Sequence, residues 1–380
     1  MKSHSDLTVK VVKKIDDISP REWNAAFPDI LEGYHFFKTI DESGFEGHSF
    51  YYVMVYKKDS PVGAAPCFVM DYPLDTTVEG PLKKFLVKVK EFFPNILHLR
   101  ALICGSVASE GRIGIAAGPK GPVIKKISSA METLARKERA SLVAFKDFSE
   151  HYTDALEILI KEGFYKINGY PAVELEINFK SFDEYLDTLS RATRKDLRRK
   201  FKKANGHAKI DLEVRDEIGG ALDDAYFLYL QTLYKSEVQF ERVPKDFFEN
   251  ISKNMKNRVK YFLWRVDGRL VAFNLCLVSG EGLVDEYLGL DYLLTHKYPL
   301  YFITFRDVIS WCIKNGVKRY ESGALTYEPK KRLGLRFTPH YIYAKHMNKF
   351  VNPFFKLLCA FLKPENFDAV LKDMKKKGLL

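Results

Sequence analysis

Several kinds of functional site are missing from this 380-residue sequence. It contains no Cys-x-x-Cys pair, no His-x-x-x-His and no carboxylate cluster with the spacing of metal ligands, so we expect no metal centre. It has neither a Gly-x-Ser-x-Gly elbow nor a Gly-Lys-Ser/Thr phosphate loop, which argues against a hydrolase nucleophile and a P-loop nucleotide site. No fingerprint of a redox cofactor is present either. Metal, redox and hydrolase chemistry are therefore not predicted.

Long hydrophobic runs are also missing. No stretch approaches the ~18 consecutive apolar residues of a membrane-spanning helix, and the first residues contain no apolar signal segment. The five cysteines are odd in number and lie mostly within apolar runs, so we interpret them as buried reduced thiols. These features predict a cytoplasmic protein.

What the chain does contain is a large apolar fraction and an excess of positive charge. With 46% hydrophobic and 14% aromatic residues, it can bury a core large enough for two ordinary domains. The net charge of +11 predicts an anionic partner, such as nucleic acid, a phosphorylated ligand or an anionic membrane surface. The alternative is that the charge serves solubility alone.

The clearest order of secondary structure lies between Lys260 and Met347. Asp267-Gly268 separates two alternating apolar runs and is typical of a hairpin turn, because both residues tolerate positive φ. Later apolar residues recur at three- and four-residue steps, which indicates a helix. The expected elements are strands at 261–266, 270–278 and 283–290, a helix at 301–314, and strands at 317–322 and 341–346. This order predicts a mixed sheet of α/β or α+β class.

An earlier part of the chain repeats this order. It has hairpin strands expected at 50–56 and 62–70, a helix at 128–137, and strands at 141–145 and 172–177. We therefore predict an internal duplication, with extra residues inserted in the first copy. The predicted domains are residues 1–180 with a basic insertion at 71–118, residues 181–350, and a basic amphipathic tail at 351–380.

Short motifs within the second copy suggest a family. They are Tyr287-x-Gly289, Trp311-x-x-x-x-Gly316, Tyr320-Glu-Ser-Gly-Ala324, Lys330-Lys-Arg-Leu-Gly334 and Arg336-Phe-Thr-Pro339. Their order resembles the core of the GNAT N-acyltransferases. It is most similar to the FemAB/FemX branch, whose members resemble two GNAT domains in tandem. The resemblance implies two tandem GNAT-like domains and the transfer of an acyl or aminoacyl group to an amine.

The same resemblance implies a role for one lysine. Lys330 matches the lysine that FemX-like proteins carry before a short Phe-Gly element, here Leu333-Gly334. It would neutralise charge on the donor or on the developing oxyanion. Pro329 replaces the aromatic residue that normally precedes this lysine, so Lys331 is the alternate. With Arg332, these residues place three cations on a turn that can bind an anionic donor.

Acidic residues on the neighbouring strands are the candidate bases. Strand alternation predicts that Asp285 and Tyr287 share one face, that Glu286 takes the other, and that Glu321 lies on the next strand. A carboxylate buried among apolar residues has a raised pKa, which suits a general base. An edge position or an ion pair is the alternative for each carboxylate.

The densest positive charge lies between the two copies. Residues 190–203 contain eight basic residues and one acidic residue, Asp196. Helical spacing predicts one shared face for the cations at Arg191, Arg194, Lys195, Arg198 and Lys202. Arginine forks bind phosphates bidentately, so this face is predicted to bind a diphosphate or a nucleic-acid backbone. The alternative is a solvated face with acidic partners elsewhere.

Two glycine and lysine patterns complete the candidates. In GNAT proteins a glycine-rich loop binds the coenzyme A pyrophosphate, but the spacing in Gly111–Gly121 is wrong, and we interpret it as a plain loop. The second copy has no glycine at 291–299, which argues against coenzyme A there.

Residues 80–94 read as a lysine-bearing amphipathic helix, and a similar pattern follows Asn352. Such a helix packs on a core or lies on a membrane surface.

Two hypotheses follow. The first is an N-acyltransferase centred on the second copy, using acyl-coenzyme A or aminoacyl-tRNA as donor and an amine as acceptor, without metal or redox cofactor. It would act in peptidoglycan-type biosynthesis, with peripheral contact at the inner face of an anionic membrane. The second is a non-catalytic GNAT-fold binder of RNA or anionic lipid, which requires only the basic faces.

Overall fold

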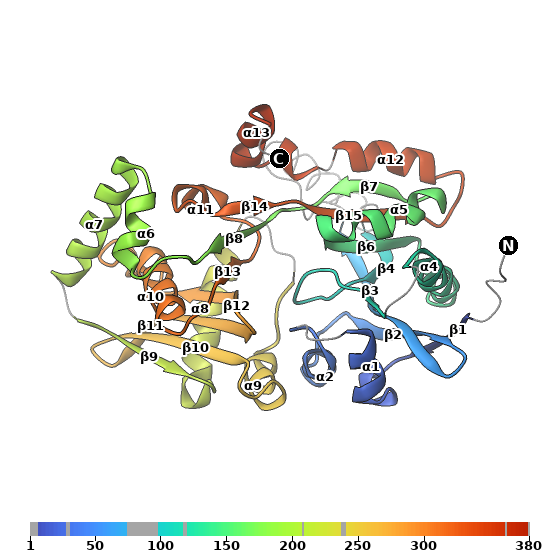
Figure 1. The fold of residues 1–380 in the computed structure, drawn as a ribbon, viewed down its shortest axis with the longest axis horizontal. Coiled ribbons are helices and arrows are strands. Elements are labelled where there is room, and N and C mark those ends of the chain that lie inside the picture. The colour runs from blue at the N-terminus through green and yellow to red at the C-terminus, as the bar shows by residue number, and fades with distance from the viewer. Residues whose placement is uncertain are drawn as a thin grey trace. The chain divides into compact units, whose positions relative to one another are not determined.

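Two mixed sheets organise the chain (Figure 1). The structure is a computed structural model that describes residues 7–27, 31–73, 98–116, 120–206, 209–236, 241–361 and 363–378. The chain divides into two compact units, of which the first comprises residues 1–171 and 338–380 and the second residues 172–337. The predicted helix at 80–94, and with it most of the basic insertion, lies outside the described residues.

The first unit contains the sheet β1-β2-β3-β4-β6-β15-β7, with β5 paired to β3. Its strands are β1 (Leu7–Val12), β2 (Ser49–Lys57), β3 (Ser60–Pro73), β4 (His98–Cys104), β5 (Gly114–Ile115), β6 (Leu142–Ser149), β7 (Tyr165–Asn168) and β15 (His340–His346). Its helices are α1 (Pro20–Ala26), α2 (Tyr34–Glu42), α4 (Lys120–Lys137), α5 (Thr153–Lys161), α12 (Asn352–Phe361) and α13 (Ala369–Lys376). Strands β4 and β6 are parallel, and α4 is the crossover that joins them.

The second unit contains the sheet β14-β8-β13-β12-β11-β10-β9. Its strands are β8 (Ala172–Glu176), β9 (Ile210–Arg215), β10 (Val259–Val266), β11 (Arg269–Ser279), β12 (Gly282–Leu290), β13 (Arg319–Ser322) and β14 (Arg336–Thr338). Its helices are α6 (Phe182–Thr188), α7 (Arg191–Asn205), α8 (Leu222–Lys235), α9 (Lys245–Asn254), α10 (Leu300–Lys314) and α11 (Tyr327–Arg332). Here β12 and β13 are parallel, and α10 crosses between them.

The predicted duplication is confirmed by the strand orders. Read from β1 and from β9, the two sheets match strand for strand, with the parallel pair, the crossover helix and the last two strands in the same places. Both predicted hairpins are present, as β2–β3 and β10–β11. Asp267 and Gly268 both adopt positive φ in the second hairpin, as the turn requires.

Two strands lie in the opposite sheet from the one we predicted. Strand β8 was expected to complete the first copy but pairs with β13, and β15 was expected to complete the second copy but pairs with β6 and β7. For β14 and β15 the reason is the length of the connection. Only Pro339 separates β14 from β15, whereas a hairpin needs at least two loop residues. The chain therefore runs straight on into the other sheet, and the predicted domain ranges 1–180 and 181–350 differ from the compact units accordingly.

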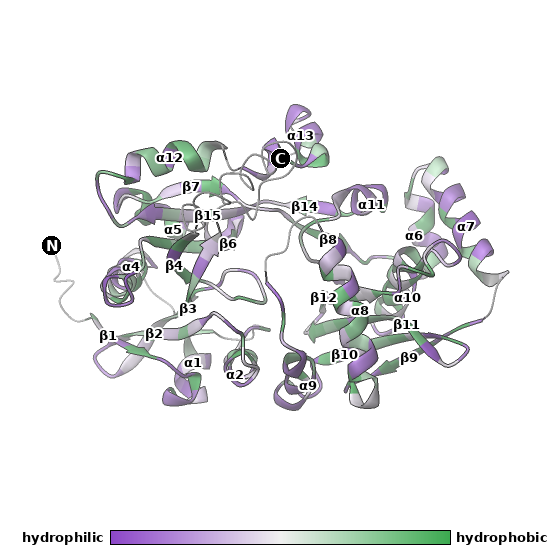
Figure 2. Cartoon of the chain, turned by 180° about the vertical axis from the view of Figure 1, so that it is seen from behind, coloured by the Kyte–Doolittle hydropathy of each residue, from purple (hydrophilic) through white to green (hydrophobic). Residues whose placement is uncertain are grey.

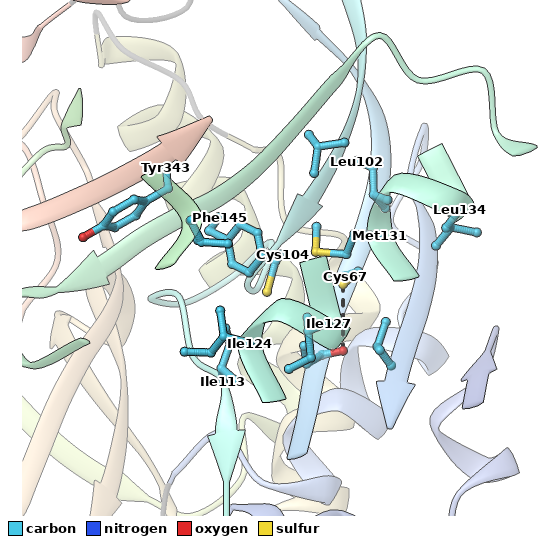
Figure 3. Close-up of a cluster of buried hydrophobic side chains, with 14 of the residues drawn as sticks. Cys67, Leu102, Cys104, Ile113, Ile124, Ile127, Met131, Leu134, Phe145 and Tyr343 are labelled. Atoms are coloured by element: carbon cyan, nitrogen blue, oxygen red, sulfur yellow. Dashed lines mark hydrogen bonds between the residues drawn. The ribbon is translucent and has the colours of Figure 1, made fainter. Parts of the chain in front are cut away.

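The core of the first unit includes a side chain from the exchanged strand. Tyr343 on β15 is fully buried in the cluster that contains Phe145 of β6 and Met131 of α4 (Figure 3). Cys67 and Cys104, opposite each other on β3 and β4, lie in the same cluster as free thiols. The first sheet thus depends on residues 340–346 for part of its core as well as for two pairings.

A close approach of α8 to β12 generates a stability prediction. A Cβ atom at Gly289 would lie 2.3 Å from a ring carbon of Phe273 and 2.8 Å from the backbone nitrogen of Tyr229. Gly289→Ala should therefore lower the free energy of unfolding by ~1–3 kcal/mol, because the helix or the ring must shift. Urea unfolding measures the change. Gly220→Ala is the control, since no atom lies within 4 Å of its added Cβ, and equal stability of both variants would contradict the packing argument.

Candidate active site

A pocket of about 740 Å³ opens in the second unit where its two parallel strands part. Strand β13 pairs with β12 only from Gly282–Arg319 to Asp285–Ser322, and β12 then continues to Leu290. The carboxyl ends of parallel strands are the usual place for ligands in such sheets. The lining comes from β12, β13, α8, the start of α10, Lys200 of α7 and the segment 323–330.

A β-bulge on β12 brings three candidate residues to this pocket. Leu275 pairs with Tyr287 and the next residue, Cys276, pairs with Asp285, so Glu286 is the extra residue on β12. A bulge interrupts the alternation of side chains. As a result Asp285, Glu286 and Tyr287 all line the pocket, and our expectation that Glu286 takes the opposite face is wrong.

Lys330 and Asp285 both line the pocket, and the charge of each affects the pKa of the other. The side chain of Lys330 is buried, and its Nζ donates to the carbonyl oxygen of Gly323. Burial lowers the pKa of Lys330 to about 8, although the negative charge of Asp285 opposes this shift. The ammonium is therefore mostly protonated at pH 7, at a place where charge is poorly solvated.

Asp285 is held by hydrogen bonds from two neighbouring strands. The hydroxyl of Tyr320 on β13 donates to its carboxylate at 2.7 Å, and the side chain of Asn274 on β11 also donates to it. Burial raises the pKa of Asp285, while these donors and the charge of Lys330 act in the opposite direction. The carboxylate is thus oriented within the pocket and is a stronger base than an exposed aspartate.

Two residues in the segment after β13 adopt a backbone conformation that few residues other than glycine tolerate. Leu325 and Thr326 both have left-handed conformations, with φ of 71° and 53°. Such conformations cost free energy in branched residues and are frequent at functional sites. The segment leads from the Gly323 carbonyl to α11, so it fixes the acceptor of the Lys330 ammonium and the helix that carries Lys330.

Two further lysines line the pocket and were not among the predicted site residues. The Nζ of Lys200 lies 4.6 Å from the ring centre of Phe302, and that of Lys235 lies 4.0 Å from the ring centre of Tyr292. Lys200 is on α7 but outside the face that we predicted to bind anions. Its spacing from the apolar Leu197 and Ala204 is the sequence signal that places it on the packed side of the helix.

The predicted anion-binding face of α7 is partly engaged within the chain. Arg194 donates to the Asp187 carbonyl oxygen at 3.1 Å, at the end of α6, and its guanidinium lies 3.5 Å from the Asp187 carboxylate. Arg198 is half-exposed and lies 4.0 Å from carboxylate oxygens of Asp183 and Asp187. Arg191, Lys195 and Lys202 are exposed, and no carboxylate in the described part of the chain pairs with them. Figure 2 shows α7 largely in the hydrophilic colour.

The remaining predicted residues lie away from the lining. Arg332 pairs with Asp196 of α7 at 2.9 Å, and Lys200 also hydrogen-bonds Asp196, so that the pKa of this carboxyl is lowered to about 2. Glu321 alternates with Tyr320 and Ser322, which line the pocket, and does not line it itself. Lys331 does not line it either. The structure therefore brings together Lys330, Asp285, Glu286 and Tyr287.

The glycine-rich loop of the first unit is packed against its sheet. A Cβ at Gly111 would lie 2.0 Å from the carbonyl oxygen of Lys146, and one at Gly114 would lie 2.5 Å from that of Ala26. Arg112 pairs with Glu32 at 3.1 Å. These glycines permit close backbone packing. We predicted a plain loop over 111–121, but the structure places strand β5 at Gly114–Ile115 and the start of α4 at Lys120, while residues 117–119 lie outside the described part.

Comparison with known proteins decides the family. A model of the FemAB-like family, described as peptidoglycan biosynthesis/recognition, matches residues 83–375, which is more than half of the chain. The chain belongs to the FemAB-like family.

Solved structures similar to this FemAB-like chain share its tandem fold. FemX has 14% identity and a TM-score of 0.57, covering 92% of this chain and 100% of FemX. A tandem GNAT protein from the clavulanic acid biosynthesis pathway has 9% identity and a TM-score of 0.53, covering 90% and 99%. L-PGS from Bacillus licheniformis has 12% identity and a TM-score of 0.50, covering 88% and 96%. These likenesses confirm the predicted pair of GNAT-like units.

The curated relatives of this FemAB-like chain are longer proteins, and the chain matches only part of each. In two strains of Mycobacterium tuberculosis, a protein named putative 8-amino-7-oxononanoate synthase 2 is 25% identical over 336 residues. The match takes in 83% of this chain and 42% of the relative. The chain therefore spans less than half the length of these relatives.

The described residues contain neither a membrane-spanning helix nor a metal-binding group. No helix there has the length and apolarity needed to cross a membrane. No group of three or more His, Cys, Asp or Glu side chains in those residues is arranged to hold a metal ion.

The contacts of α7 predict different effects for its two central arginines. Arg194→Ala should lower the free energy of unfolding by ~1 kcal/mol, because a charged donor is lost from the end of α6. Arg198→Ala should change it by less than ~0.5 kcal/mol, as expected for an exposed ion pair. Urea unfolding of both variants measures this. Equal stabilities of the two variants would contradict the capping role of Arg194. Because Arg198→Ala should leave the fold intact, a raised KM in that variant would report the loss of ligand binding by Arg198.

Proposed function

We propose that this FemAB-like protein is an N-acyltransferase or aminoacyltransferase, and that its reaction takes place in the pocket of the second unit. The observation that carries the proposal is the buried ammonium of Lys330 beside the oriented carboxylate of Asp285. The family description, peptidoglycan biosynthesis/recognition, supports an acceptor amine on a cell-envelope precursor. Neither group requires a metal ion or a redox cofactor for this chemistry.

Lys330 is the proposed oxyanion stabiliser. In acyl transfer the amine nitrogen attacks the donor carbonyl carbon, and a C–N bond forms while the carbonyl oxygen becomes negative. The C–O bond of an ester donor, or the C–S bond of a thioester donor, then breaks. A cation fixed in a poorly solvated pocket stabilises this negative oxygen more strongly than water does. The Gly323 carbonyl holds Lys330 in place without cancelling its charge.

Asp285 is the proposed proton acceptor. The attacking amine must lose a proton as the C–N bond forms, and this proton must reach the departing oxygen or sulfur. A carboxylate of raised pKa, held by Tyr320 and Asn274, can accept it and return it to the leaving group. Glu286 also lines the pocket and is the second carboxylate to test.

The contacts at the start of α10 and the charges of α7 bear on which donor the protein uses. At the start of α10, the amides of Phe302 and Ile303 both bond to the Pro299 carbonyl, and that of Leu300 bonds to the Tyr298 carbonyl. These amides are therefore engaged and are poorly placed to bind the pyrophosphate of coenzyme A. The exposed cations of α7 fit a nucleic-acid backbone better. We thus favour aminoacyl-tRNA over acyl-coenzyme A.

A transfer assay with both donors tests this preference. Purified protein is supplied with an amine-bearing peptidoglycan precursor and either mixed aminoacyl-tRNA or acetyl-coenzyme A, and the acylated product is detected by mass spectrometry. Product should form from aminoacyl-tRNA, and the KM of that donor should rise with salt because phosphate contacts are screened. Product from acetyl-coenzyme A alone would overturn the donor assignment, and none from either donor would count against transfer.

The first catalytic prediction concerns Lys330. Lys330→Ala should lower kcat by ~10²–10³, because one stabilising contact to the oxyanion is lost. Lys331→Ala is the matched control and should retain activity, since Lys331 does not line the pocket. Steady-state kinetics and a thermal melt separate catalysis from folding. A non-catalytic binder of RNA or lipid would require neither residue, so unchanged transfer in a folded Lys330→Ala protein would rule out the proposed role.

The second catalytic prediction concerns pH. Because the pKa of Lys330 is about 8, a reaction that needs its ammonium should fall about tenfold per pH unit above that value. A reaction that also needs the Asp285 carboxylate should fall at acidic pH, where this carboxylate of raised pKa becomes protonated. The charge of Asp285 raises this pKa, so Asp285→Asn should move the alkaline limb to lower pH as well as reduce kcat. Profiles of kcat against pH measure both effects. Glu286→Gln is the comparison, and an alkaline limb unmoved by Asp285→Asn would contradict the pairing.

A further inference from the structure

Helix α12 exposes several large apolar residues to the surroundings. Phe350 is 87% exposed, and on the helix itself Phe354 is 71% and Leu357 70% exposed. Leu358 lies four residues after Phe354, so Phe354, Leu357 and Leu358 share one outer surface of the helix. Phe350 is in the turn just before the helix. Figure 2 shows most of α12 in the hydrophobic colour. We call Phe350, Phe354, Leu357 and Leu358 the apolar face of α12.

The helix is fixed in this orientation by its contacts with the first unit. Phe355 and Cys359, one turn apart, are buried on its inner side. Asn352 at its start accepts a hydrogen bond from the His346 amide at 2.9 Å and donates one to the Gly163 carbonyl at 3.0 Å. The apolar face therefore cannot turn inward without breaking both the packing and these hydrogen bonds, so it needs a partner outside the unit.

The charges around the apolar face identify the chemistry of that partner. Residues 347–363 contain Lys349, Lys356 and Lys363 but no acidic residue. The Nζ of Lys356 lies 5.4 Å from the ring centre of Tyr165, so this lysine faces the unit, whereas Lys349 and Lys363 lie beyond the two ends of the helix. Lysines at the ends of an exposed apolar surface are typical of helices that lie in the interface of an anionic bilayer, with the ammonium groups among the lipid headgroups. The segment 80–94 of the same chain has four lysines and one glutamate. Its positive charge would repel the lysines near the apolar face, so this segment is a poor candidate to cover it.

We propose that the apolar face of α12 docks on the surface of a phospholipid bilayer that contains anionic lipids. Phe354 and Leu357 enter the acyl-chain boundary, and Lys349, next to the exposed Phe350, contacts the headgroups. The helix is 10 residues long, so it lies along the surface rather than across the bilayer. This docking site is separate from the pocket of the second unit and does not depend on the transfer reaction proposed for it.

Vesicle binding tests the proposal on the full-length protein. Wild-type protein should co-sediment with vesicles of phosphatidylcholine and 30 mol% phosphatidylglycerol, and less with phosphatidylcholine alone. Phe354→Ser combined with Leu357→Ser should weaken binding at least about tenfold, because two apolar side chains that would be buried in the bilayer are lost. The control is Phe227→Ser combined with Tyr234→Ser, two exposed aromatic residues of α8. Equal binding of both double variants, or of wild-type protein to both vesicle types, would overturn the proposal.

A fluorescent probe separates a membrane from other partners. Leu357→Cys labelled with an environment-sensitive dye should shift its emission to the blue only when the anionic vesicles are added, and high salt should reduce the shift. A blue-shifted signal that rises with protein concentration alone would instead show a second copy of the chain on this face. A signal that is already blue-shifted and independent of concentration would show that another segment of the chain covers it. Either of these two results would overturn the proposal.

Discussion

Two short connections carry the chain from one sheet into the other. One residue, Pro339, joins β14 to β15, and three residues, 169–171, join β7 to β8. Each connection ends in a proline, which holds the residue before it in an extended conformation and opposes a reversal of direction. Each sheet therefore receives an inner strand from the other half of the sequence. Neither half can form all the backbone pairings of its own sheet, so both units depend on the complete chain.

The candidate active site depends on the point where one pairing stops. Strand β13 ends at Ser322, opposite Asp285, while β12 continues past a bulge, and the side chains beyond this point have room to line a pocket. Tyr320 of the shorter strand then supports Asp285 of the longer one. Lys330 of α11 lines the same pocket with a buried side chain. The charged pair and the cavity thus arise from the same irregularity of the sheet.

The sequence was sufficient for the local elements and for the duplication, because hairpin turns, helical periodicity and glycine stops act over a few residues. It also led to Lys330 and Asp285, through the resemblance to FemX and through a carboxylate within an apolar strand. It did not lead to the exchange of β8 and β15, which depends on pairing between distant segments, although the single residue at Pro339 excludes a hairpin. The bulge at Glu286 also escaped prediction, because it depends on tertiary contacts. Lys200 was missed although its spacing from Leu197 and Ala204 indicates the packed side of α7.

The two copies use the same topology differently. In the second unit the parting of the parallel strands leaves a pocket. In the first unit the chain after β4 folds back on β6, where the Gly111 amide bonds to the Asp147 carbonyl and Ile113 enters the core. The glycine at 111 is required for this contact, since a side chain there would collide with the Lys146 carbonyl. The loop thus occupies, in the first copy, the edge that is open in the second. Among the described residues, the buried lysine at an open strand end, Lys330, belongs to the second copy.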